Sequence, residues 1–320
     1  MTANPACWLS VIMPTYNGSA YLAAALETVA AQAGDDVQVV AVDDGSTDGT
    51  LAMLRSCSRR LPITLIERPH GSGWVANTNI GLRSATGRWV CFLHQDDLWG
   101  PRRLETLRAW TARFPGAAAI LHAARFVDEA GRRLGTWRCP LPAGRLLPGD
   151  AVVERLLVQN FVPIPAPIVL RDAVLAVGGL DEDLWYTADW DLWLKLAVVG
   201  PFVAHPEPLA SFRVHTMSQT SERTADQAAM RRQLESVLAR HLPSWAARHP
   251  GKPAVERAAR FSIEVNLALA ARSHGRPFDG VSLALAFARL GPAGWHRYVR
   301  DSRIVERVLA RRRIRRTRPR

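Results

Sequence analysis

The 320-residue sequence contains no apolar run that approaches the roughly 18 to 20 residues needed to cross a bilayer as a helix. Its N-terminus has no basic segment followed by an apolar one, so it shows no signal peptide. We therefore expect a cytoplasmic protein. Internal repeats are also absent. The hydrophobic content of 48% and charged content of 22% are those of a globular chain with one large or two small domains.

Cysteine is scarce, and the spacing of the cysteines argues against folds that are held together by disulfides or by zinc. The four cysteines include no Cys-x-x-Cys pair, so the pattern indicates neither a disulfide framework nor a zinc site. We expect reduced thiols, most of them buried.

Acidic residues are absent from the last ten positions, residues 311–320, which contain seven arginines. Most of the formal net charge of +12 therefore belongs to this tail. Such a tail binds nucleic acid or anionic lipid headgroups, or is solvated and disordered. Because the rest of the chain has little excess charge, we expect no nucleic-acid partner. A nucleic-acid-binding protein remains a competing hypothesis that rests on the tail alone.

The first 97 residues alternate between short apolar runs and helical patterns. Apolar, β-prone runs at 8–13, 37–42, 63–66 and 88–93 predict strands. Patterns at about 19–32, around Leu51 and Leu54, and at 74–85 predict the intervening helices. This β–α alternation predicts a parallel sheet with right-handed crossovers.

Polar loops follow three of these predicted strands. Asp96-Asp97 ends one strand, the segment Asp43–Thr50 follows another, and Pro14–Gly18 follows the first. Because the carboxyl ends of parallel strands meet at one edge, these loops should converge on a ligand site. Two adjacent carboxylates repel each other unless a cation joins them, so the pair predicts a hard divalent ion such as Mg²⁺ or Mn²⁺.

The second half of the chain mixes elements before it becomes helical. Residues 98–101 should break the strand and open a helix at 101–113. Further elements are expected as strands at 117–127, 132–137, 168–170 and 209–214, a loop at 138–149 and a helix at 152–158. From residue 221 onward the pattern is helical, with breaks at Pro243, 250–251, 275–277 and 291–292.

A helix beginning at Asp189 places this acid in the first turn, at the positive end of the helix dipole. Trp190 and Trp193 recur at helical spacing and are expected in the core. Trp185 precedes the helix and is the better candidate to contact an acceptor sugar. Asp191 is a near neighbour that could exchange roles with Asp189 or contact the acceptor.

Taken in order, these segments resemble the signature of the family-2 glycosyltransferases, which have the GT-A fold. The matching segments are 11–17, 42–50, 79–81 with 85–87, and 92–97, followed by 189–193 and 213–215. The resemblance covers about residues 8–220. It implies a GT-A domain at 1–220, with a nucleotide-sugar half at 1–112 and an acceptor half at 113–220. Residues 221–320 are then a helical extension that ends in the basic tail.

The resemblance also implies roles for individual residues. The nucleotide sugar would be held by Pro14, Thr15, Tyr16, Asp44, Asn79, Asp96 and Arg213. The metal would be held by Asp96 and Asp97, with His215 approaching from the C-terminal side. Asp189 matches the catalytic base of an inverting transfer from a nucleotide-diphosphate sugar to a hydroxyl acceptor.

Two positions depart from the family pattern. His94 stands where an acid is common, and Ala188 replaces the usual glutamate before the base. These departures leave a non-catalytic nucleotide-sugar binder as the alternative function. The segment Gly71–Ala76 imitates a dinucleotide fingerprint, but it follows the third strand rather than the first, so we disfavour a dehydrogenase.

The expected partners follow from the same resemblance. We expect a hexose or deoxyhexose from a UDP- or dTDP-sugar, and a saccharide or lipid-linked glycan precursor as acceptor, as in polysaccharide biosynthesis. Residues 304, 305, 308 and 309 form an apolar stripe beside many arginines. A basic amphipathic helix of this kind can lie on an anionic membrane, so peripheral contact at the inner face is a further expectation.

Overall fold

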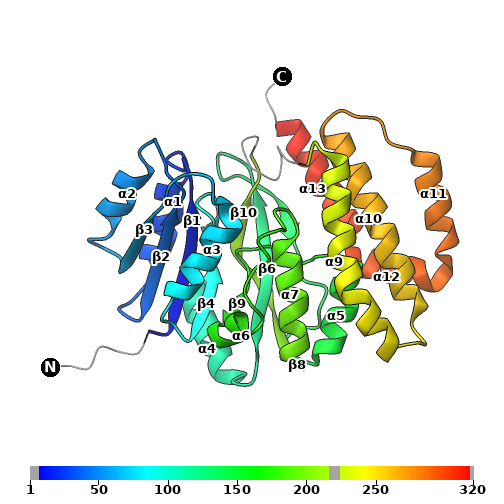
Figure 1. Ribbon diagram of the computed structural model, residues 1–320, viewed down its shortest axis with the longest axis horizontal. Helices are drawn as coiled ribbons and strands as arrows, with labels where there is room; N and C mark the ends of the chain where they lie inside the picture. Colours follow the sequence, from blue (N-terminus) through cyan, green and yellow to red (C-terminus); the bar gives the residue numbers. More distant parts are fainter. Residues whose placement is uncertain (1–6, 216–223, 318–320) are drawn as a thin grey trace.

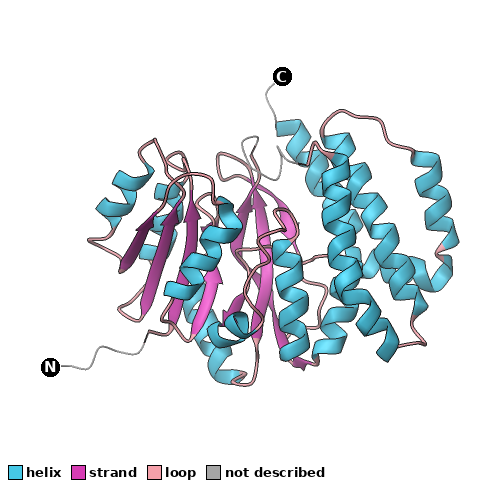
Figure 2. Ribbon diagram, in the orientation of Figure 1, coloured by secondary structure: helices cyan, strands magenta, loops and turns pink. Residues whose placement is uncertain are grey.

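The computed structural model describes residues 7–215 and 224–317. A twisted sheet with helices on both faces occupies one part of the molecule, and a group of helices forms the other (Figures 1 and 2). This is the mixed α/β class that the sequence predicts, with a C-terminal helical extension. No helix among the described residues is long and apolar enough to cross a membrane.

The first half forms a parallel β–α unit. Strand β1 (Leu9–Thr15) lies between β2 and β4 and pairs in parallel with both. The remaining elements are β2 (Val37–Asp43), β3 (Ile63–Glu67), β4 (Trp89–Phe92), α1 (Leu22–Ala30), α2 (Thr50–Cys57) and α3 (Gly73–Ser84). The parallel pairing brings the loops after β1, β2 and β4 to one edge, as the sequence predicts.

The second half extends the same sheet with strands of both directions. Its elements are β5 (Leu98–Trp99), α4 (Arg103–Arg113), β6 (Ala119–Val127), β7 (Arg133–Trp137), β8 (Leu146–Leu147), α5 (Gly149–Val158), β9 (Ile168–Leu170), α6 (Arg171–Ala176), α7 (Ala188–Val199) and β10 (Phe202–Arg213). The strand order is β3-β2-β1-β4-β9-β6-β10-β5, with β7 beside β6 and β8 beside β10. The expected halves 1–112 and 113–220 thus share one continuous sheet.

Two short strands form where the sequence predicted a chain break and a loop. Leu98 and Trp99 pair antiparallel with β10, although the sequence predicted a break there. Leu146 and Leu147, inside the expected loop 138–149, also pair with β10. Both strands depend on a partner more than fifty residues away in the chain, so local sequence gives no signal for them.

The extension consists of α9 (Gln227–Arg248), α10 (Pro253–Ser273), α11 (Gly280–Arg289), α12 (Gly291–Ser302) and α13 (Ile304–Thr317). Breaks occur at 250–251, 275–277 and 291–292 as predicted. The predicted break at Pro243 is wrong, because α9 continues through it. Residues 311–317 of the basic tail continue α13, and residues 318–320 lie outside the described residues.

Two apolar clusters fill the two faces of the sheet. One contains Leu22, Leu54 and Leu107 from α1, α2 and α4. The other contains side chains of α3, α5 and α7, and it continues without a gap into residues of α9 and α10. The helical extension therefore packs on the sheet domain through a shared core.

Candidate functional site

His94, Asp96 and Asp97 form a cluster directly after β4. One potential ligand atom from each lies within 4.8 Å of the others, and these three are the only such group among the described residues. Asp97 is 1% exposed, and its Oδ1 accepts a hydrogen bond of 2.9 Å from the backbone N–H of Arg213. The Oδ2 atom of Asp97 and Nε2 of His94 are buried without a hydrogen-bond partner.

Electrostatics at this cluster favour a bound cation. Burial, and then the charge of Asp96, raise the pKa of the Asp97 carboxyl well above its usual value. Two adjacent carboxylates with an unsatisfied buried oxygen match the donor set that a hard divalent ion prefers. The residues present therefore fit Mg²⁺ or Mn²⁺, and His94 adds a nitrogen that could join them.

Asp96 is held from the C-terminal side of the domain. Its Oδ2 lies 2.8 Å from Nε2 of His215. Burial by itself would raise the pKa of Asp96, but the contact with His215 keeps that pKa below its usual value. Asp96 thus remains an anion at neutral pH, beside the more easily protonated Asp97.

Arg213 serves mainly to hold backbone in place. Its Nε donates to the carbonyl oxygen of Asp96, and its Nη1 donates to the carbonyl oxygens of Asp128 and Glu129. The guanidinium also lies 5.0 Å from the ring centroid of Tyr21. Arg213 is 5% exposed, so it joins the loop after β4 to the β6–β7 turn, and these bonds leave little of it for the expected diphosphate contact.

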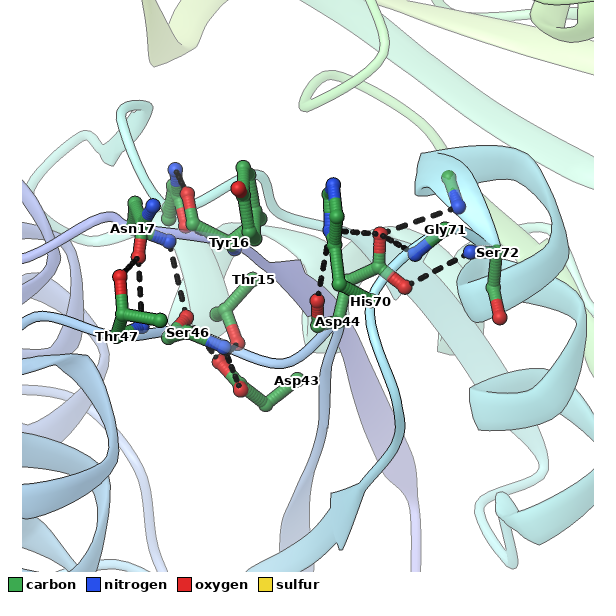
Figure 3. A network of polar contacts seen from close by, with 12 residues as sticks. Thr15, Tyr16, Asn17, Asp43, Asp44, Ser46, Thr47, His70, Gly71 and Ser72 are labelled. Atoms are coloured by element: carbon green, nitrogen blue, oxygen red, sulfur yellow. Dashed lines mark hydrogen bonds and ion pairs between the residues drawn. The ribbon is translucent and has the colours of Figure 1, made fainter.

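The loops after β1 and β2 are joined by a polar network, shown in Figure 3. Asp43 is fully buried and accepts hydrogen bonds from the Thr15 hydroxyl and from the N–H and hydroxyl of Ser46. Asn17 then contacts Ser46 and Thr47. Pro14 and Thr15 are paired with Val42 and Asp43 in the sheet, so they shape the site through backbone position.

Asp44 caps the N-terminus of α3 from a neighbouring strand. Its two oxygens accept from the backbone N–H groups of Gly71, Ser72 and Gly73 (Figure 3). Burial would raise the pKa of Asp44, but hydrogen bonds that include these N–H groups hold it below its usual value. A carboxylate already occupies the position where a dinucleotide phosphate would sit, which argues against the dehydrogenase reading of 71–76.

Tyr16 presents an aromatic face beside this network. Its backbone N–H and carbonyl form a reciprocal pair of 2.9 Å hydrogen bonds with the Gln95 side chain. Its ring stacks on His70, with centroids 4.2 Å apart and an interplanar angle of 15°. The Nδ1 atom of His70 lies 3.1 Å from the carbonyl oxygen of Asp44, which fixes the stacked pair to the end of β2.

Asn79 was expected to bind the nucleotide sugar, and the structure contradicts this. Its Oδ1 accepts from the N–H of Leu180, while its Nδ2 donates to the carbonyl of Leu180 and to Glu182. The residue is 5% exposed. Asn79 therefore secures the turn before α7, and its amide is fully engaged by protein groups.

Asp189 lies in the first turn of α7 and is partly exposed. Its Oδ2 accepts a 3.0 Å hydrogen bond from Nδ2 of Asn160, and its Oδ1 accepts from the N–H of Trp190. Burial is the main cause that raises the pKa of Asp189 to about 6. A carboxyl group of this kind is suited to exchanging a proton near neutral pH.

Asp191 was expected as an acceptor contact or as a substitute base, and both roles are excluded by its position. It is fully buried, with Arg240 Nη1 at 2.9 Å and His241 Nε2 at 2.8 Å from Oδ1. Lys195 Nζ lies 3.0 Å from Oδ2. Burial would raise the pKa of Asp191, but these partners hold it far below its usual value. Asp191 is the ion-paired link between α7 and α9.

Trp74 connects the cluster of His94, Asp96 and Asp97 to the segment that precedes α7. Its ring meets the His94 ring edge-on, with centroids 5.2 Å apart. Its Nε1 donates a 3.0 Å hydrogen bond to the carbonyl oxygen of Trp185. Trp185 is partly exposed, as an acceptor contact requires, whereas Trp190 and Trp193 lie in the core as expected. Trp74 therefore links the loop after β4 to the segment that leads into α7.

Sequence reasoning missed four residues that organise this site: Trp74, His70, Gln95 and Asn160. Two of them, Trp74 and Gln95, lie inside segments that the sequence analysis used, but none was given a role of its own. Gln95 had a local signal, since it stands inside the His94–Asp97 segment. The partners of Trp74 and Asn160 are remote in the chain, so only the fold reveals them.

Comparison with known proteins agrees with the geometry. The model of the family described as Glycosyl transferase family 2 matches residues 10–148, which include both loop networks and the acid pair. A protein of Haemophilus influenzae, described as an uncharacterized glycosyltransferase, is 29% identical over 229 residues, covering 69% of this chain and 74% of its own length. The matching segment and this relative support a glycosyltransferase of family 2. A second uncharacterized glycosyltransferase, from Nostoc sp., is 27% identical over 235 residues, covering 69% of this chain and 71% of that protein.

Two solved structures have the same fold as this chain. Residues 1–349 of Staphylococcus aureus TarS, in complex with UDP-GlcNAc, superpose with a TM-score of 0.58 at 17% identity, covering 94% of this chain and 92% of that one. The mannosyltransferase PcManGT from Pyrobaculum calidifontis, with GDP-Man and Mn²⁺, gives 0.54 at 20% identity, covering 97% and 87%. The chain therefore has the GT-A fold. The family model and the curated relatives support sugar transfer as its class of reaction.

Proposed function

We propose that this glycosyltransferase moves a sugar from a nucleoside-diphosphate sugar to a hydroxyl of a saccharide or lipid-linked glycan precursor, with inversion at the anomeric carbon. The observation that carries the proposal is Asp189, a partly buried carboxyl with a pKa of about 6, in a chain that also has the acid pair Asp96-Asp97 at the end of β4. A general base is most effective when its pKa lies near the working pH. The retained base and acid pair favour an enzyme over a non-catalytic binder.

Asp96 and Asp97 would hold Mg²⁺ or Mn²⁺, with His94 or His215 completing the protein ligands. When bound, the ion supplies Lewis-acid stabilisation for a diphosphate leaving group. Support comes from the buried, unpartnered Oδ2 of Asp97 and from the Mn²⁺ in the PcManGT structure. Mg²⁺ and Mn²⁺ both suit such an oxygen-rich donor set.

The chemical step combines one proton transfer with one displacement at the anomeric carbon. Asp189 accepts the proton of the acceptor hydroxyl, while the hydroxyl oxygen attacks the anomeric carbon on the face opposite the diphosphate. The bond from the anomeric carbon to the phosphate oxygen breaks, and its electron pair leaves with the nucleoside diphosphate. A single displacement of this kind inverts the configuration. Asn160 would keep the accepting oxygen of Asp189 in place.

Donor and acceptor would occupy opposite sides of the acid pair. The Tyr16–His70 stack offers an aromatic surface to the base of a UDP- or dTDP-sugar, and Asp44 would act indirectly by fixing His70 and the start of α3. Trp185 would offer its ring to the apolar face of an acceptor sugar. The UDP and UDP-GlcNAc bound to TarS support a uridine donor.

A donor screen tests the proposal. The protein is incubated with UDP-, dTDP- and GDP-sugars, with Mg²⁺ or Mn²⁺ and a mixture of saccharide and lipid-linked acceptors, and nucleoside diphosphate release is measured. Metal-dependent release from one donor is expected, and Asp97→Ala should abolish it together with metal-dependent nucleotide binding. Saturable UDP binding without release under any acceptor condition would favour the non-catalytic binder. Unchanged nucleotide affinity in Asp97→Ala would refute the metal site.

A further inference from the structure

Helix α11 is apolar on the side that faces solvent as well as on the side that faces the protein. Leu283, Ala286 and Phe287 are partly buried against the core. The opposite face carries Val281, Ala284, Leu285 and Ala288, all exposed, and no residue of α11 is fully buried. A soluble helix normally places polar side chains on its outer face, so this outer face is unusual in having no partner within residues 7–215 and 224–317.

The exposed apolar surface continues onto α12. Trp295 stacks on Phe287 with ring centroids 6.0 Å apart, and its Nε1 donates to the carbonyl oxygen of Phe287. Ten large apolar side chains are exposed across the described residues, and half of them lie between positions 278 and 299. The α11–α12 surface consists of these five: Phe278, Val281, Leu285, Trp295 and Val299.

The helices α11 and α12 and the segments that flank them carry more basic than acidic residues. Residues 272–309 contain seven arginines and three acidic residues. Asp301 is fully buried in ion pairs, Glu306 pairs with Arg303, and Asp279 caps α11 by accepting from Ser282. An anionic partner complements such a region. A second copy of the same chain would bring like charges together, which disfavours self-association.

We propose that the α11–α12 surface docks on an anionic lipid bilayer, with its apolar side chains in the headgroup interface and the surrounding arginines on the lipid phosphates. An apolar helix face with a tryptophan and flanking basic residues is the physical pattern of interfacial membrane contact. Docking deepens the proposed function, because it would bring the enzyme to a lipid-linked acceptor. The proposal itself needs no catalysis to be tested.

This proposal places the membrane contact on the α11–α12 surface, whereas the sequence favoured the apolar stripe at residues 304–309. Within the stripe 304–309, Ile304 packs against the core, which leaves Val305 and Leu309 as the large exposed side chains. Helix α13 instead lies beside β7, where Arg313 Nη1 donates to the carbonyl oxygen of Leu134. Helix α11, at the outer edge of the extension in Figure 1, offers its whole outer face.

Vesicle flotation with the full chain tests the proposal. The probes are phosphatidylcholine vesicles with and without phosphatidylglycerol. Wild type should float with the anionic vesicles, and Val281→Glu/Leu285→Glu should lower partitioning at least about tenfold, since it replaces apolar contacts by charges that the lipid repels. The matched control is Val198→Glu/Val199→Glu at the end of α7, where the side chains are 65% and 55% exposed. This control should float like wild type.

Three outcomes would overturn the docking proposal: no flotation of the wild type, equal loss in both double variants, or a dimer in sedimentation that only the α11 variant dissociates. Leu285→Gln, which adds no charge, should show a smaller loss in the same direction and guards against misfolding. Nucleoside diphosphate release in solution is measured on the same proteins. A wild type that floats without turnover would refute the proposed function alone.

Discussion

Two aspartates that stand two positions apart in α7 have opposite environments. Asp189 is partly exposed, accepts one side-chain hydrogen bond from Asn160, and has a raised pKa of about 6. Asp191 is buried among Lys195, Arg240 and His241, which stabilise its anionic form. One acid can therefore exchange a proton near neutrality, and the other remains ionised at all practical pH values.

Replacing Asp189 should separate chemistry from binding. Asp189→Asn keeps the size of the side chain and one acceptor oxygen, but its amide cannot accept a proton. We expect sugar transfer to fall by about 10² to 10⁴, the usual contribution of general-base catalysis, with nucleotide affinity nearly unchanged. Single-turnover transfer and calorimetric nucleotide binding measure the two effects. Full activity would remove Asp189 from this role.

The pH dependence of transfer should report the same carboxyl group. Because the base acts when deprotonated, the rate should rise with pH to a plateau above about 6. Asn160 donates to Asp189 and so lowers its pKa. Asn160→Ala should therefore move the rising limb to higher pH. The control is Gln38→Ala, whose side chain bonds with Ser10 and Thr64 away from the site. Identical profiles for all three proteins would contradict the assignment.

At the scale of elements, the start of α3 depends on Asp44, the residue that directly follows β2. The first N–H groups of a helix have no partner inside it. The side chain of Ser72, the N-cap residue of α3, does not accept a hydrogen bond from any of them. Asp44 supplies the acceptor, and its negative charge suits the positive end of the helix dipole. The Gly71–Ser72–Gly73 turn is thus built around a protein carboxylate.

Removing that carboxylate should destabilise the fold. Asp44→Ala leaves buried N–H groups without an acceptor, so we expect the free energy of unfolding to fall by about 1 to 3 kcal/mol at pH 7. Because the folded pKa is lowered, this stabilisation is fully present above the unfolded pKa of about 4 and is lost as pH falls through the folded pKa. Urea unfolding at pH 7 and pH 3 measures both effects, with the exposed Asp35→Ala as control. A difference that is equally large at both pH values would contradict this account.

At the scale of the whole molecule, the helical extension is fastened to the catalytic domain by buried polar groups as well as by the shared core. Gln159 Oε1 accepts from Ser262 and Asn266 of α10 and from Arg307 of α13. Its Nε2 donates to the carbonyl of Asn160, the partner of Asp189. The extension therefore helps to define the position of the expected base.

A second fastening supports a stability prediction. Asp301 of α12 is fully buried and pairs with Arg155 of α5 at 3.2 Å and with Arg300 at 2.7 Å. Asp301→Asn leaves Arg155 without its charged partner, so we expect a loss of about 3 kcal/mol in unfolding free energy. The matched control is Asp172→Asn, whose side chain is 93% exposed and which should change stability little. Equal unfolding midpoints for the two variants would refute this role.

The sequence by itself indicated the GT-A class and the first four strands with their parallel pairing, and it singled out the acid pair and Asp189 as expected site residues. These features arise from local patterns, since apolar periodicity sets β1 to β4 and parallel pairing brings their polar ends to one edge. The breaks in the extension were equally local, apart from Pro243, which α9 accommodates.

Tertiary structure alone decided which polar residues remain available to a ligand. Asn79 and Asp191 were expected as site residues. In the fold, their side chains form hydrogen bonds with protein groups about fifty to a hundred residues away in the chain. Trp74 and Asn160 entered the site by the same long-range contacts. The short strands β5 and β8, and the exposed outer face of α11, likewise depend on what packs beside them. Burial and hydrogen bonding belong to the folded arrangement, whereas residue type and periodicity belong to the chain.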